Sequence, residues 1–540
     1  MSDANKPDRL WMAILAGYCI YAALFILRTS FVLDGERYFS LFDDAMISMT
    51  YARNLAHGQG LVWNPGGERV EGITNLAWTL YMALLHLIPL AKSKISLLVQ
   101  ATSAVLLLVS LVFVKRIAQA ISEGSRFVWV GAVVLSAFYM PTNNWSLQGM
   151  EVGLLILLVG LAVDRTIRAI QSGRFSLVPY AILALAMLVR LDMAVPFAVV
   201  LVFMAATDRE NRKKHITFGL AFFGVAVASQ TIFRVLYYGD LLPNTYYQKL
   251  TGYPFLWRIT RGLYVTFVFI WRMNWIFFLV PVSLLFMKRS RPERLLACLV
   301  GGQLAYSIFV GGDAWENWGG ANRYVCIAMP CFFILFCRGL DTIGERIKAY
   351  LTKCRPGLAA ETGARYIRRA AVALVLVSLA SFNAIYGPAA LTQLLLLKRP
   401  LHVDDNERMA ARGLAIAKIT GQRARVAVVW DGAIPYFSER YAISILGKND
   451  RKIAREPMKT FSGPKKLVAF YPGHLKWDYP YSIGQLKPDV VAQLWQNPET
   501  AAPYLNTDYL QVRVGGFGMH LKSGSPNIRW DRVSTLSPNG

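Results

Sequence analysis

Charged residues are scarce in this chain. They make up 17% of its 540 residues, whereas hydrophobic residues make up 55%, and soluble domains average about 25% charged residues. Apolar stretches recur between residues 10 and 388 and then stop, and the remainder has the composition of an ordinary soluble domain. The sequence therefore predicts a large membrane domain over residues 1–390 and a smaller polar domain over residues 391–540.

Acidic residues are especially few. The chain has 33 Asp and Glu against 58 Lys and Arg, a formal net charge of +25. A nucleic-acid partner is one explanation of such an excess, but the basic residues do not form one patch. They gather in short connections between apolar runs, at residues 115–116, 165–174, 209–214, 288–294 and 338–369. This is the positive-inside pattern of cytoplasmic loops, so the charge indicates a membrane protein without a nucleic-acid partner.

Cysteines and nucleotide-binding motifs are also rare or missing. All six cysteines lie in apolar runs or in a basic loop, and none lies in the polar domain, so neither a disulfide framework nor a paired metal spacing is predicted. A P-loop, a strand-associated GxGxxG and an HExxH motif are absent from the sequence. A nucleotide cofactor is therefore not expected, and a donor for external chemistry would arrive through the membrane lipid.

The basic loops fix the direction of each apolar run. The first run, 10–33, is too long for a signal-peptide core and is predicted as a retained span leading outward. The run 95–114 must then lead inward to the basic pair at 115–116, which makes residues 34–94 a first external loop. Within that loop the apolar stretch 73–90 is predicted to lie half-buried at the external interface.

The remaining apolar runs are predicted to complete 11 crossings. Four of them have only about 13 to 15 residues, below the roughly 20 needed to span a bilayer, so they are expected to leave a water-filled hollow in the outer leaflet. The short runs are 127–140, 151–163, 176–189 and 193–206, and longer runs follow at about 216–236, 274–287, 295–310, 323–340 and 371–388. An odd number of spans from a cytoplasmic N-terminus places the polar domain outside.

An acidic pair, Asp43-Asp44, precedes a helical pattern over residues 44–57, with Gly58 as the expected C-cap. Asp43 alone can be explained as an N-cap, but a second acid beside it favours the helix dipole only weakly. A carboxylate that faces a hollow can instead act as a general base toward a hydroxyl acceptor. Both interpretations of the pair stay open from spacing alone.

Basic and aromatic residues mark two further external segments. Arg190 and Asp192 are expected at the tip of a short hairpin, where an arginine must be paired or hydrated. They form either a local ion pair or an anion site that grips phosphate oxygens in a fork. The segment 234–249 contains four tyrosines and ends at Lys249, which fits either an aromatic belt or sugar stacking beside a phosphate-binding lysine.

Two more polar tips, residues 145–151 and 311–323, complete the external set. Both contain acids and tryptophans, and turn chemistry with interfacial tryptophans would account for each alone. The external tips together carry acids, arginines and aromatics, whereas the inner loops carry mainly basic residues. This asymmetry predicts an active site on the external face.

These same segments carry a family resemblance. The run FDDAMISMTYARNLAHGQGLVWNPGGERVEGITN (42–75) resembles the first external loop of GT-C glycosyltransferases, and most closely that of bacterial, mycobacterial-type arabinofuranosyltransferases that depend on polyprenyl-phosphate arabinose. The resemblance covers nearly the whole chain. It continues through WSLQGME (145–151), RLD (190–192), FRVLYYGDLLPNTYYQK (233–249), GGDAWENWGGANR (311–323), VVWDGAIPYFSERYAISILGKNDRKIA (428–454) and PGHLKWDYPYSI (472–483).

The resemblance implies a multi-spanning α-helical membrane domain of the GT-C type, followed by a small extracytoplasmic (periplasmic) α/β domain, in the bacterial inner membrane. Such an enzyme serves cell-envelope biogenesis. It moves a sugar, here D-arabinofuranose, from a polyprenyl-phosphate donor to an envelope glycan, lipopolysaccharide or glycoprotein. An aspartate of the first external loop, matching Asp43 or Asp44, is the catalytic residue that the resemblance implies.

The expected site residues fall into three sets. The donor phosphate and sugar are assigned to His57, Arg190, Asp192, Arg234, Tyr246, Tyr247, Lys249 and Arg323. The acceptor is assigned to Glu71, Asn244, Trp430 and Trp477. A divalent cation is a further possibility, held by Asp43, Asp44 or Asp313. The chain departs from the arabinofuranosyltransferase pattern at residues 315–318 and at Ser444, where an acid is expected, so the acceptor stays open.

Other functions remain as alternatives. A single displacement would invert the anomeric centre, whereas retention would need a second carboxylate as nucleophile. Another lipid-linked sugar is compatible with the same site. A non-catalytic transporter or scaffold subunit is a different class, but transporters typically show inverted repeats with broken helices at the midplane, and the sequence shows neither.

The polar domain is expected to be a small α/β fold. A helix is predicted over 407–419 and strands over 425–430, 467–471 and 488–491, with a turn at Asp431-Gly432. Its aromatic residues offer flat surfaces to a glycan, although packing in the core is the alternative for each of them.

Overall fold

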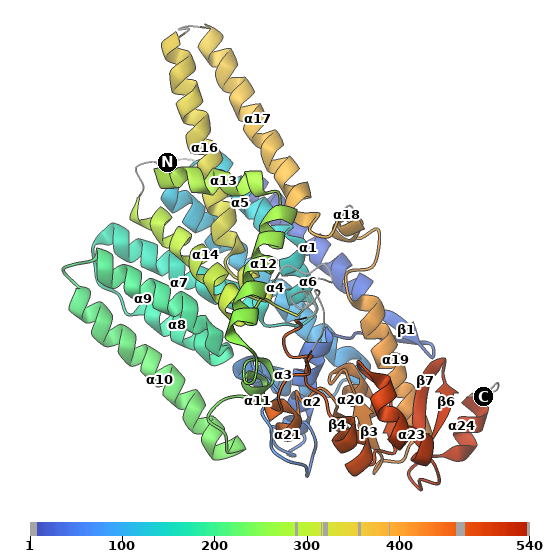
Figure 1. The fold of residues 1–540 in the computed structure, drawn as a ribbon. Coiled ribbons are helices and arrows are strands. Elements are labelled where there is room, and N and C mark those ends of the chain that lie inside the picture. The colour runs from blue at the N-terminus through green and yellow to red at the C-terminus, as the bar shows by residue number, and fades with distance from the viewer. Residues whose placement is uncertain are drawn as a thin grey trace.

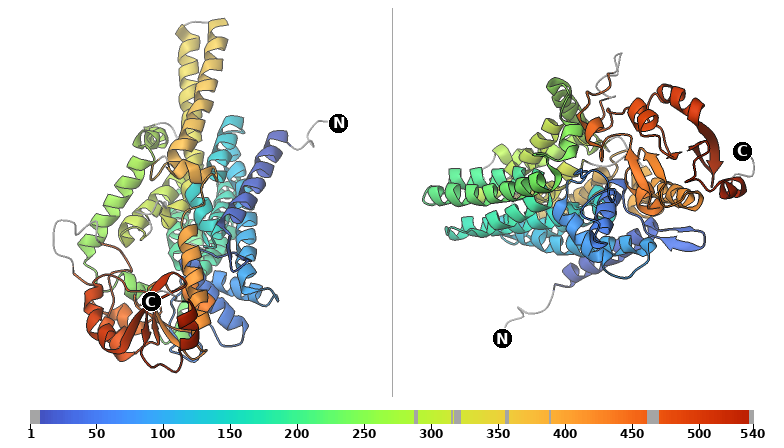
Figure 2. Two further views of the ribbon diagram at one scale, coloured as in Figure 1. Left: turned by 90° about the vertical axis from the view of Figure 1, so that its right-hand side faces the viewer. Right: turned by 90° about the horizontal axis from the view of Figure 1, so that it is seen from below.

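The computed structural model describes residues 8–286, 290–314, 316, 322–354, 358–387, 389–460 and 470–536. A bundle of helices forms the bulk of the molecule, and a small sheet-containing domain packs against one end of it (Figure 1). The helices α16 (Met329–Cys354) and α17 (Leu358–Asn383) form a long hairpin that projects from the opposite end (Figures 1 and 2). The bundle therefore has two chemically different ends.

Among the residues that the structure describes, five helices are long and apolar enough to cross a membrane, and the number rises to seven if each of two bent helix pairs is one span. The five are α1 (Arg9–Thr29), α4 (Lys92–Ile121), α10 (Arg212–Tyr238), α14 (Arg291–Val310) and the segment Thr362–Asn383 of α17. The pairs are α6 (Met140–Leu147) with α7 (Val152–Ser172), bent by 117°, and α12 (Phe255–Arg272) with α13 (Trp275–Ser283), bent by 93°.

The shorter apolar helices are α3 (Leu76–His86), α5 (Arg126–Ala137), α8 (Val178–Val189) and α9 (Ala194–Thr207). A helix thus coincides with every apolar run that the sequence marked as a span. The predicted total of 11 crossings is not established by these lengths, because within the described ranges only five to seven helices or bent pairs meet the requirement for a full span.

Two predicted segments differ in the structure, and one helix was not predicted. The described part of the expected span at 274–287 contains the nine-residue helix α13 and a short 3-10 turn, and it is preceded by α12, which was not predicted. Two arginines interrupt the apolar pattern of α12. Helix α7 runs through the basic segment to Ser172, because the buried carboxylate of Asp164 lies 2.8 Å from Arg116 and 3.3 Å from Arg168.

The first external loop begins with a hairpin of β1 (Phe31–Leu33) and β2 (Glu36–Tyr38), followed by α2 (Asp43–Ala56) and α3. The N-cap of α2 is Phe42, with no side-chain cap hydrogen bond, so the alternative of an Asp43 cap is wrong. Helix α3 buries Trp78 and Met82 while exposing a leucine face, so it is half-buried as expected, and its place at the membrane interface stays a prediction.

The C-terminal domain combines helix α19 (Val403–Ile419) with a five-stranded sheet of order β4-β3-β5-β7-β6. The strands are β3 (Arg425–Val428), β4 (Tyr441–Ser444), β5 (Val490–Val491), β6 (Tyr509–Val514) and β7 (Phe517–Lys522). Strand β3 is parallel to β4 and β5, whereas β7 is antiparallel to both of its neighbours.

The predicted helix and two of the three predicted strands of this domain are confirmed as α19, β3 and β5. The third expected strand, 467–471, falls mostly on residues that the structure does not describe, and Phe470 and Tyr471 are irregular. Strands β4, β6 and β7 were not predicted. Each is short or has exposed apolar positions, so its alternation is weak in the sequence.

The C-terminal domain packs directly on the first external loop. Helix α20 (Ala433–Ser438) contacts α2, and Arg53 of α2 donates to the backbone oxygen of Tyr436 at 2.8 Å. A Cβ atom on Gly432 would lie 2.0 Å from the backbone oxygen of Asp43, so only glycine permits this approach. The two parts, far apart in the chain, therefore form one packed unit at the end of the bundle opposite the α16–α17 hairpin (Figure 2).

Candidate active site

A cavity of about 200 Å³ lies where the first external loop, the ends of several membrane helices and the C-terminal domain meet. Its charged lining comes from seven separate parts of the chain. These residues are Asp44, Glu71, Arg190, Asp192, Arg234, Lys249, Asp313, Arg323 and Lys448. Apolar and aromatic side chains such as Leu191, Tyr246 and Val310 complete the wall. A site with this composition can hold a ligand that has both charged and apolar parts.

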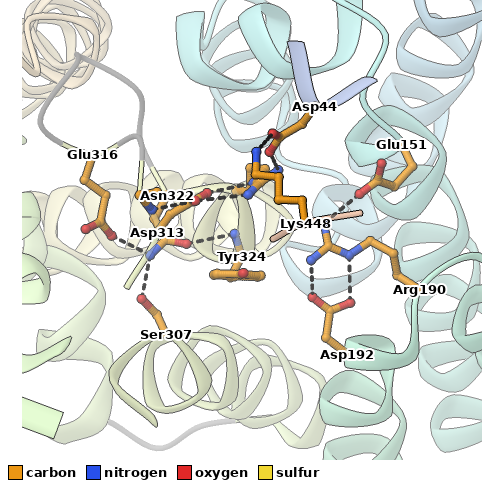
Figure 3. A network of polar contacts seen from close by, with 12 residues as sticks. Asp44, Glu151, Arg190, Asp192, Ser307, Asp313, Glu316, Asn322, Tyr324 and Lys448 are labelled. Atoms are coloured by element: carbon orange, nitrogen blue, oxygen red, sulfur yellow. Dashed lines mark hydrogen bonds and ion pairs between the residues drawn. The ribbon is translucent and has the colours of Figure 1, made fainter. Parts of the chain in front are cut away.

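Asp44 lies in the first turn of α2 and faces this cavity. Its Oδ2 atom lies 3.0 Å from Nη1 of Arg323, and its Oδ1 atom accepts a hydrogen bond from Nζ of Lys448 at 2.8 Å (Figure 3). Burial disfavours the ionised carboxyl, but the nearby Lys448 and Arg323 outweigh it and hold the pKa of Asp44 well below its usual range. Asp44 is therefore a carboxylate at neutral pH.

Asp43 has different surroundings. Neighbouring residues of a helix point about 100° apart, and the Oδ1 atom of Asp43 accepts a hydrogen bond from the backbone N–H of Ala433 at 3.0 Å. Asp43 does not contribute to the cavity wall. Burial raises the pKa of its carboxyl to about 6. The two acids of the pair thus have separate positions, one in the cavity and one in the interface with the C-terminal domain.

Arg323 lies in the short helix α15 (Arg323–Cys326) and joins two carboxylates. Its Nε and Nη2 atoms contact the two oxygens of Asp313 at 2.7 and 3.1 Å, and its Nη1 atom contacts Asp44. Such a bidentate contact fixes the plane of the guanidinium group. Arg323 therefore presents a fixed positive charge to the cavity.

Arg190 forms a second fixed group. It contacts Asp192 through two parallel bonds of 2.7 and 3.1 Å, and its Nη1 atom lies 2.6 Å from Glu151 (Figure 3). Glu151 in turn accepts a hydrogen bond from Asn75 at 2.8 Å. The local Arg190–Asp192 pair offered as one explanation is thus present, and both of its residues also line the cavity.

A third ion pair joins the end of α10 to the first external loop. Arg234 contacts both carboxylate oxygens of Glu71, one of them at 3.4 Å. Both residues line the cavity, so the groups assigned to donor and acceptor neutralise each other in this structure.

Lys249 differs from the other charged residues of the wall. It lies at the end of α11 (Asn244–Lys249), and its ammonium has no ion-pair partner within 4.0 Å among the residues that the structure describes, whereas every other charged residue of the wall has one. Burial and the nearby Arg323 lower its pKa to about 8. A buried cation without a counterion is costly, so this lysine favours an anionic ligand beside it.

Besides Asp43, five of the residues assigned from the sequence lie outside the cavity wall. His57 caps the far end of α2, about 20 Å along the helix from Asp44, and is exposed. The ring of Tyr247 lies against an arginine of α21 (Arg451–Arg455). Asn244 binds backbone carbonyls of the C-terminal domain. Trp477 is buried in the core of that domain and Trp430 is half-buried there. Their assigned roles stay predictions.

The carboxylates considered for a cation do not gather into one group. In the described part of the chain there is no cluster of three or more His, Cys, Asp or Glu side chains suited to a metal ion. Asp44 and Asp313 are joined by a guanidinium, and Asp43 faces a backbone N–H. The divalent cation stays a prediction.

Lys448 is the charged wall residue that sequence reasoning did not assign. It follows the carboxyl end of β4, and Asp431 follows that of the neighbouring parallel strand β3. Ligand-binding residues of parallel sheets commonly follow the carboxyl ends of strands. The segment 428–454 contains this signal. Because β4 was not predicted, however, the carboxyl end of that strand could not be located, and Lys448 was not assigned.

Two sequence comparisons bear on this site. A family model described as a domain of unknown function (DUF8728) matches residues 401–524. A terminal β-(1→2)-arabinofuranosyltransferase of Mycobacterium tuberculosis is 32% identical over 218 residues, which is 38% of this chain and 34% of that relative. The match therefore spans about a third of the relative's length.

Two solved structures share the architecture. ArnT from Cupriavidus metallidurans, bound to undecaprenyl phosphate, aligns with a TM-score of 0.54 at 12% identity, over 96% of this chain and 99% of that one. The archaeal oligosaccharyltransferase AglB from Archaeoglobus fulgidus, in complex with an inhibitory peptide and a dolichol-phosphate, aligns with a TM-score of 0.51 at 11% identity, over 81% and 64%. The chain thus has the GT-C fold of membrane glycosyltransferases, as the resemblance implied.

Proposed function

We propose that this chain is a glycosyltransferase that moves a sugar from a polyprenyl-phosphate carrier to a hydroxyl of an envelope glycan at the external face of the membrane. One observation carries the proposal. The carboxylate of Asp44 and the ammonium of Lys249, which has no counterion among the described residues, line the same cavity. A sugar phosphate needs a cation for its leaving group, and a hydroxyl acceptor needs a base.

The charge balance of the cavity supports a phosphate-bearing donor. Five cationic side chains and four carboxylates line it, an excess of one positive charge. The excess resides on Lys249, since the other four cations are paired with carboxylates. In our proposal the donor phosphate binds between Lys249 and Arg323, and the polyprenyl chain extends along the apolar part of the wall.

Asp44 is the proposed base, and donor binding would increase its basicity. Lys448 and Arg323 hold its pKa low in this structure, which makes it a weak base. A bound phosphate competes for those cations and so raises the proton affinity of Asp44 when both substrates are present. Asp44 then takes the proton of the acceptor hydroxyl, whose oxygen attacks the anomeric carbon, and the polyprenyl phosphate leaves with the bonding electrons. A single displacement of this kind inverts the anomeric centre.

The sugar and the orientation are the finer parts of the proposal. The 32% identity to a mycobacterial arabinofuranosyltransferase favours D-arabinofuranose as the transferred sugar. The basic segment 338–369 lies on the projecting hairpin, at the end of the bundle opposite the C-terminal domain (Figure 1). The positive-inside rule then favours a C-terminal domain outside the inner membrane.

The experiment is transfer with defined substrates. Purified protein receives decaprenyl-phosphate arabinofuranose, or one of a panel of other polyprenyl-phosphate sugars, together with an arabinan acceptor, and the product is detected by mass spectrometry. Transfer of arabinose is expected from the wild type and not from Asp44→Asn. Preference for another sugar would overturn the arabinose assignment and leave the class intact. No transfer from any lipid-linked sugar, with acceptor glycans of several types, would refute the function.

A further inference from the structure

The C-terminal domain reaches into the cavity through one side chain, that of Lys448. This lysine lies in the loop between β4 and α21, its residue is 5% exposed, and its Nζ atom contacts Asp44 across 404 positions of the chain. The family model that covers this region assigns no function to it. The lysine nevertheless forms part of the same wall as Lys249 and Arg323.

The backbone beside Lys448 is held by the helix that carries Lys249. Nδ2 of Asn244 donates to the backbone oxygens of Gly447 and Lys448 at 2.9 and 3.0 Å, and Nε2 of Gln248 donates to that of Leu446 at 2.8 Å. Helix α11 thus positions the loop of Lys448 and the side chain of Lys249 together. The two lysines share one support.

The other side of the loop is fixed by buried hydrogen bonds. Oδ2 of Asp431 accepts from Asn449 at 2.8 Å and from Ser444 at 2.6 Å, and Oδ1 of Asn449 accepts from the hydroxyl of Tyr51 in α2 at 2.8 Å. A Cβ atom on Gly72 would lie 1.8 Å from Oδ1 of Asn449, so the first external loop closes tightly over this position. The lysine is therefore built into the site and has little freedom to leave it.

We propose that the C-terminal domain completes the donor-phosphate site, with Lys448 binding the phosphate group of the lipid-linked sugar beside Lys249 and Arg323. The inference rests on the proposed transfer and adds a second role for Lys448. In the free cavity Lys448 holds Asp44 as a carboxylate, and with donor bound its ammonium is shared with the phosphate.

The transfer step balances with these groups. The acceptor oxygen forms the new bond to the anomeric carbon, the bond between that carbon and the phosphate oxygen breaks, and its electron pair stays on the phosphate. The acceptor proton passes to Asp44. The negative charge that develops on the leaving phosphate is the charge that Lys448 and Lys249 stabilise.

A purely structural ion pair is the competing explanation, and the chain offers a matched control for it. Arg440 is another buried cation of the C-terminal domain, and its guanidinium donates to three backbone oxygens, those of Ala417, Thr420 and Ser438, at 3.0 to 3.2 Å. It does not line the cavity. Replacing Arg440 should lower stability without touching donor binding or the pH profile, whereas replacing Lys448 should change both of the latter.

The test uses the full-length protein and two readouts. The first is the binding of decaprenyl monophosphate to wild type, Lys448→Met, Lys448→Arg and Arg440→Met. The loss of one charge-assisted contact predicts binding about 10- to 100-fold weaker for Lys448→Met, with substantial recovery in Lys448→Arg. Arg440→Met should bind as the wild type does once it is folded. Unchanged binding by folded Lys448→Met would overturn the inference.

The second readout is the pH dependence of kcat/KM. Removing Lys448 takes a cation from beside Asp44, so the acidic limb of the profile should move to higher pH, and Lys448→Arg should return it. A limb that stays in place in Lys448→Met would contradict the role. Lipid-phosphate binding that depends on Lys448 without any sugar transfer by the wild type would support the inference and refute the proposed function, so the two can fail separately.

Discussion

The adjacent carboxylates of Asp43 and Asp44 face different partners. Oδ1 of Asp43 accepts a hydrogen bond from the backbone N–H of Ala433 at 3.0 Å, whereas Oδ1 of Asp44 accepts one from Lys448 at 2.8 Å in the cavity wall. Asp43 thus lies in the interface with the C-terminal domain, outside the cavity wall, whereas Asp44 lies in that wall, where a ligand can reach it. Their different surroundings make each the natural control for the other.

Replacing Asp44 should abolish most of the transfer activity. Asp44→Asn keeps the size of the side chain but removes the base and the counter-charge of Arg323 and Lys448. General bases contribute about 10²- to 10⁴-fold to rates, so kcat should fall by at least 100-fold. Asp43→Asn keeps an oxygen for the Ala433 N–H and should stay within a few-fold of the wild type. Initial rates of sugar transfer at saturating donor decide between them, and an active Asp44→Asn would refute the assignment.

Asp43 should also affect stability in a pH-dependent manner. Its pKa is about 6 in the folded protein against 3.8 ordinarily, because burial disfavours the charge. The folded state therefore binds this proton more tightly, and its contribution to stability decreases as pH rises from about 4 to about 6. Asp43→Asn removes the free-energy cost of burying an ionised carboxyl at this position. The variant should gain up to about 3 kcal/mol at pH 7 and nothing at pH 4.

Thermal unfolding in detergent at several pH values measures this difference. The midpoint of Asp43→Asn should exceed that of the wild type at pH 7, and the two should converge near pH 4. Asp44→Asn is the contrasting variant. The pKa of Asp44 is held below its usual range, so its charge stabilises the fold at neutral pH and the variant should be less stable there. A wild-type advantage over Asp43→Asn that persists at pH 7 would contradict the prediction.

Lys249 should affect the donor more than the acceptor. Lys249→Met removes the cation that lacks a counterion in the described structure and should raise KM for the lipid-linked donor by about 10- to 100-fold, as expected for a hydrogen bond to a charged group. The KM for the acceptor should change little. Lys487→Met is a suitable control, because Lys487 is an exposed lysine of the C-terminal domain away from the cavity. Equal effects on both substrates would argue against a phosphate contact.

The orientation in the membrane is open to a simple measurement. An alkaline phosphatase fused after Gly540 should be active in cells, and green fluorescent protein at the same position should stay dark when exported through the Sec pathway. A cysteine introduced in the basic hairpin, for example at Lys348, should react with a membrane-impermeant maleimide only after the cells are opened. The opposite labelling pattern would place the cavity in the cytoplasm and remove the proposed access of envelope acceptors.

Much of the membrane domain could be predicted from the sequence because burial in lipid requires long apolar runs. The helices α1, α4, α10 and α14 each coincide with such a run. Helix α12 escaped prediction since Arg258 and Arg261 break its apolar pattern, and the buried Arg261 is satisfied by backbone oxygens of residues 311 and 313, in a loop 50 positions away. A local pattern cannot reveal a partner at that separation.

The candidate site, like the fold, could be predicted from the sequence only in part. Arg190 with Asp192, Arg234, Lys249 and Arg323 were all assigned from external polar tips, and the structure brings them to one wall. The sequence could not distinguish Asp43 from Asp44, because their difference arises from the direction in which each points once Ala433 is packed against α2.

By itself the sequence determined the membrane domain, the polar tips between its apolar runs and the acidic pair at the start of α2, since each follows from local composition and spacing. Only the tertiary structure decided which acid faces the cavity, and that Lys448 and Lys249 both line that cavity. The physical reason is range. Hydrophobic periodicity acts over a few turns of helix, whereas the charge around Asp44 is set by side chains up to 404 positions away.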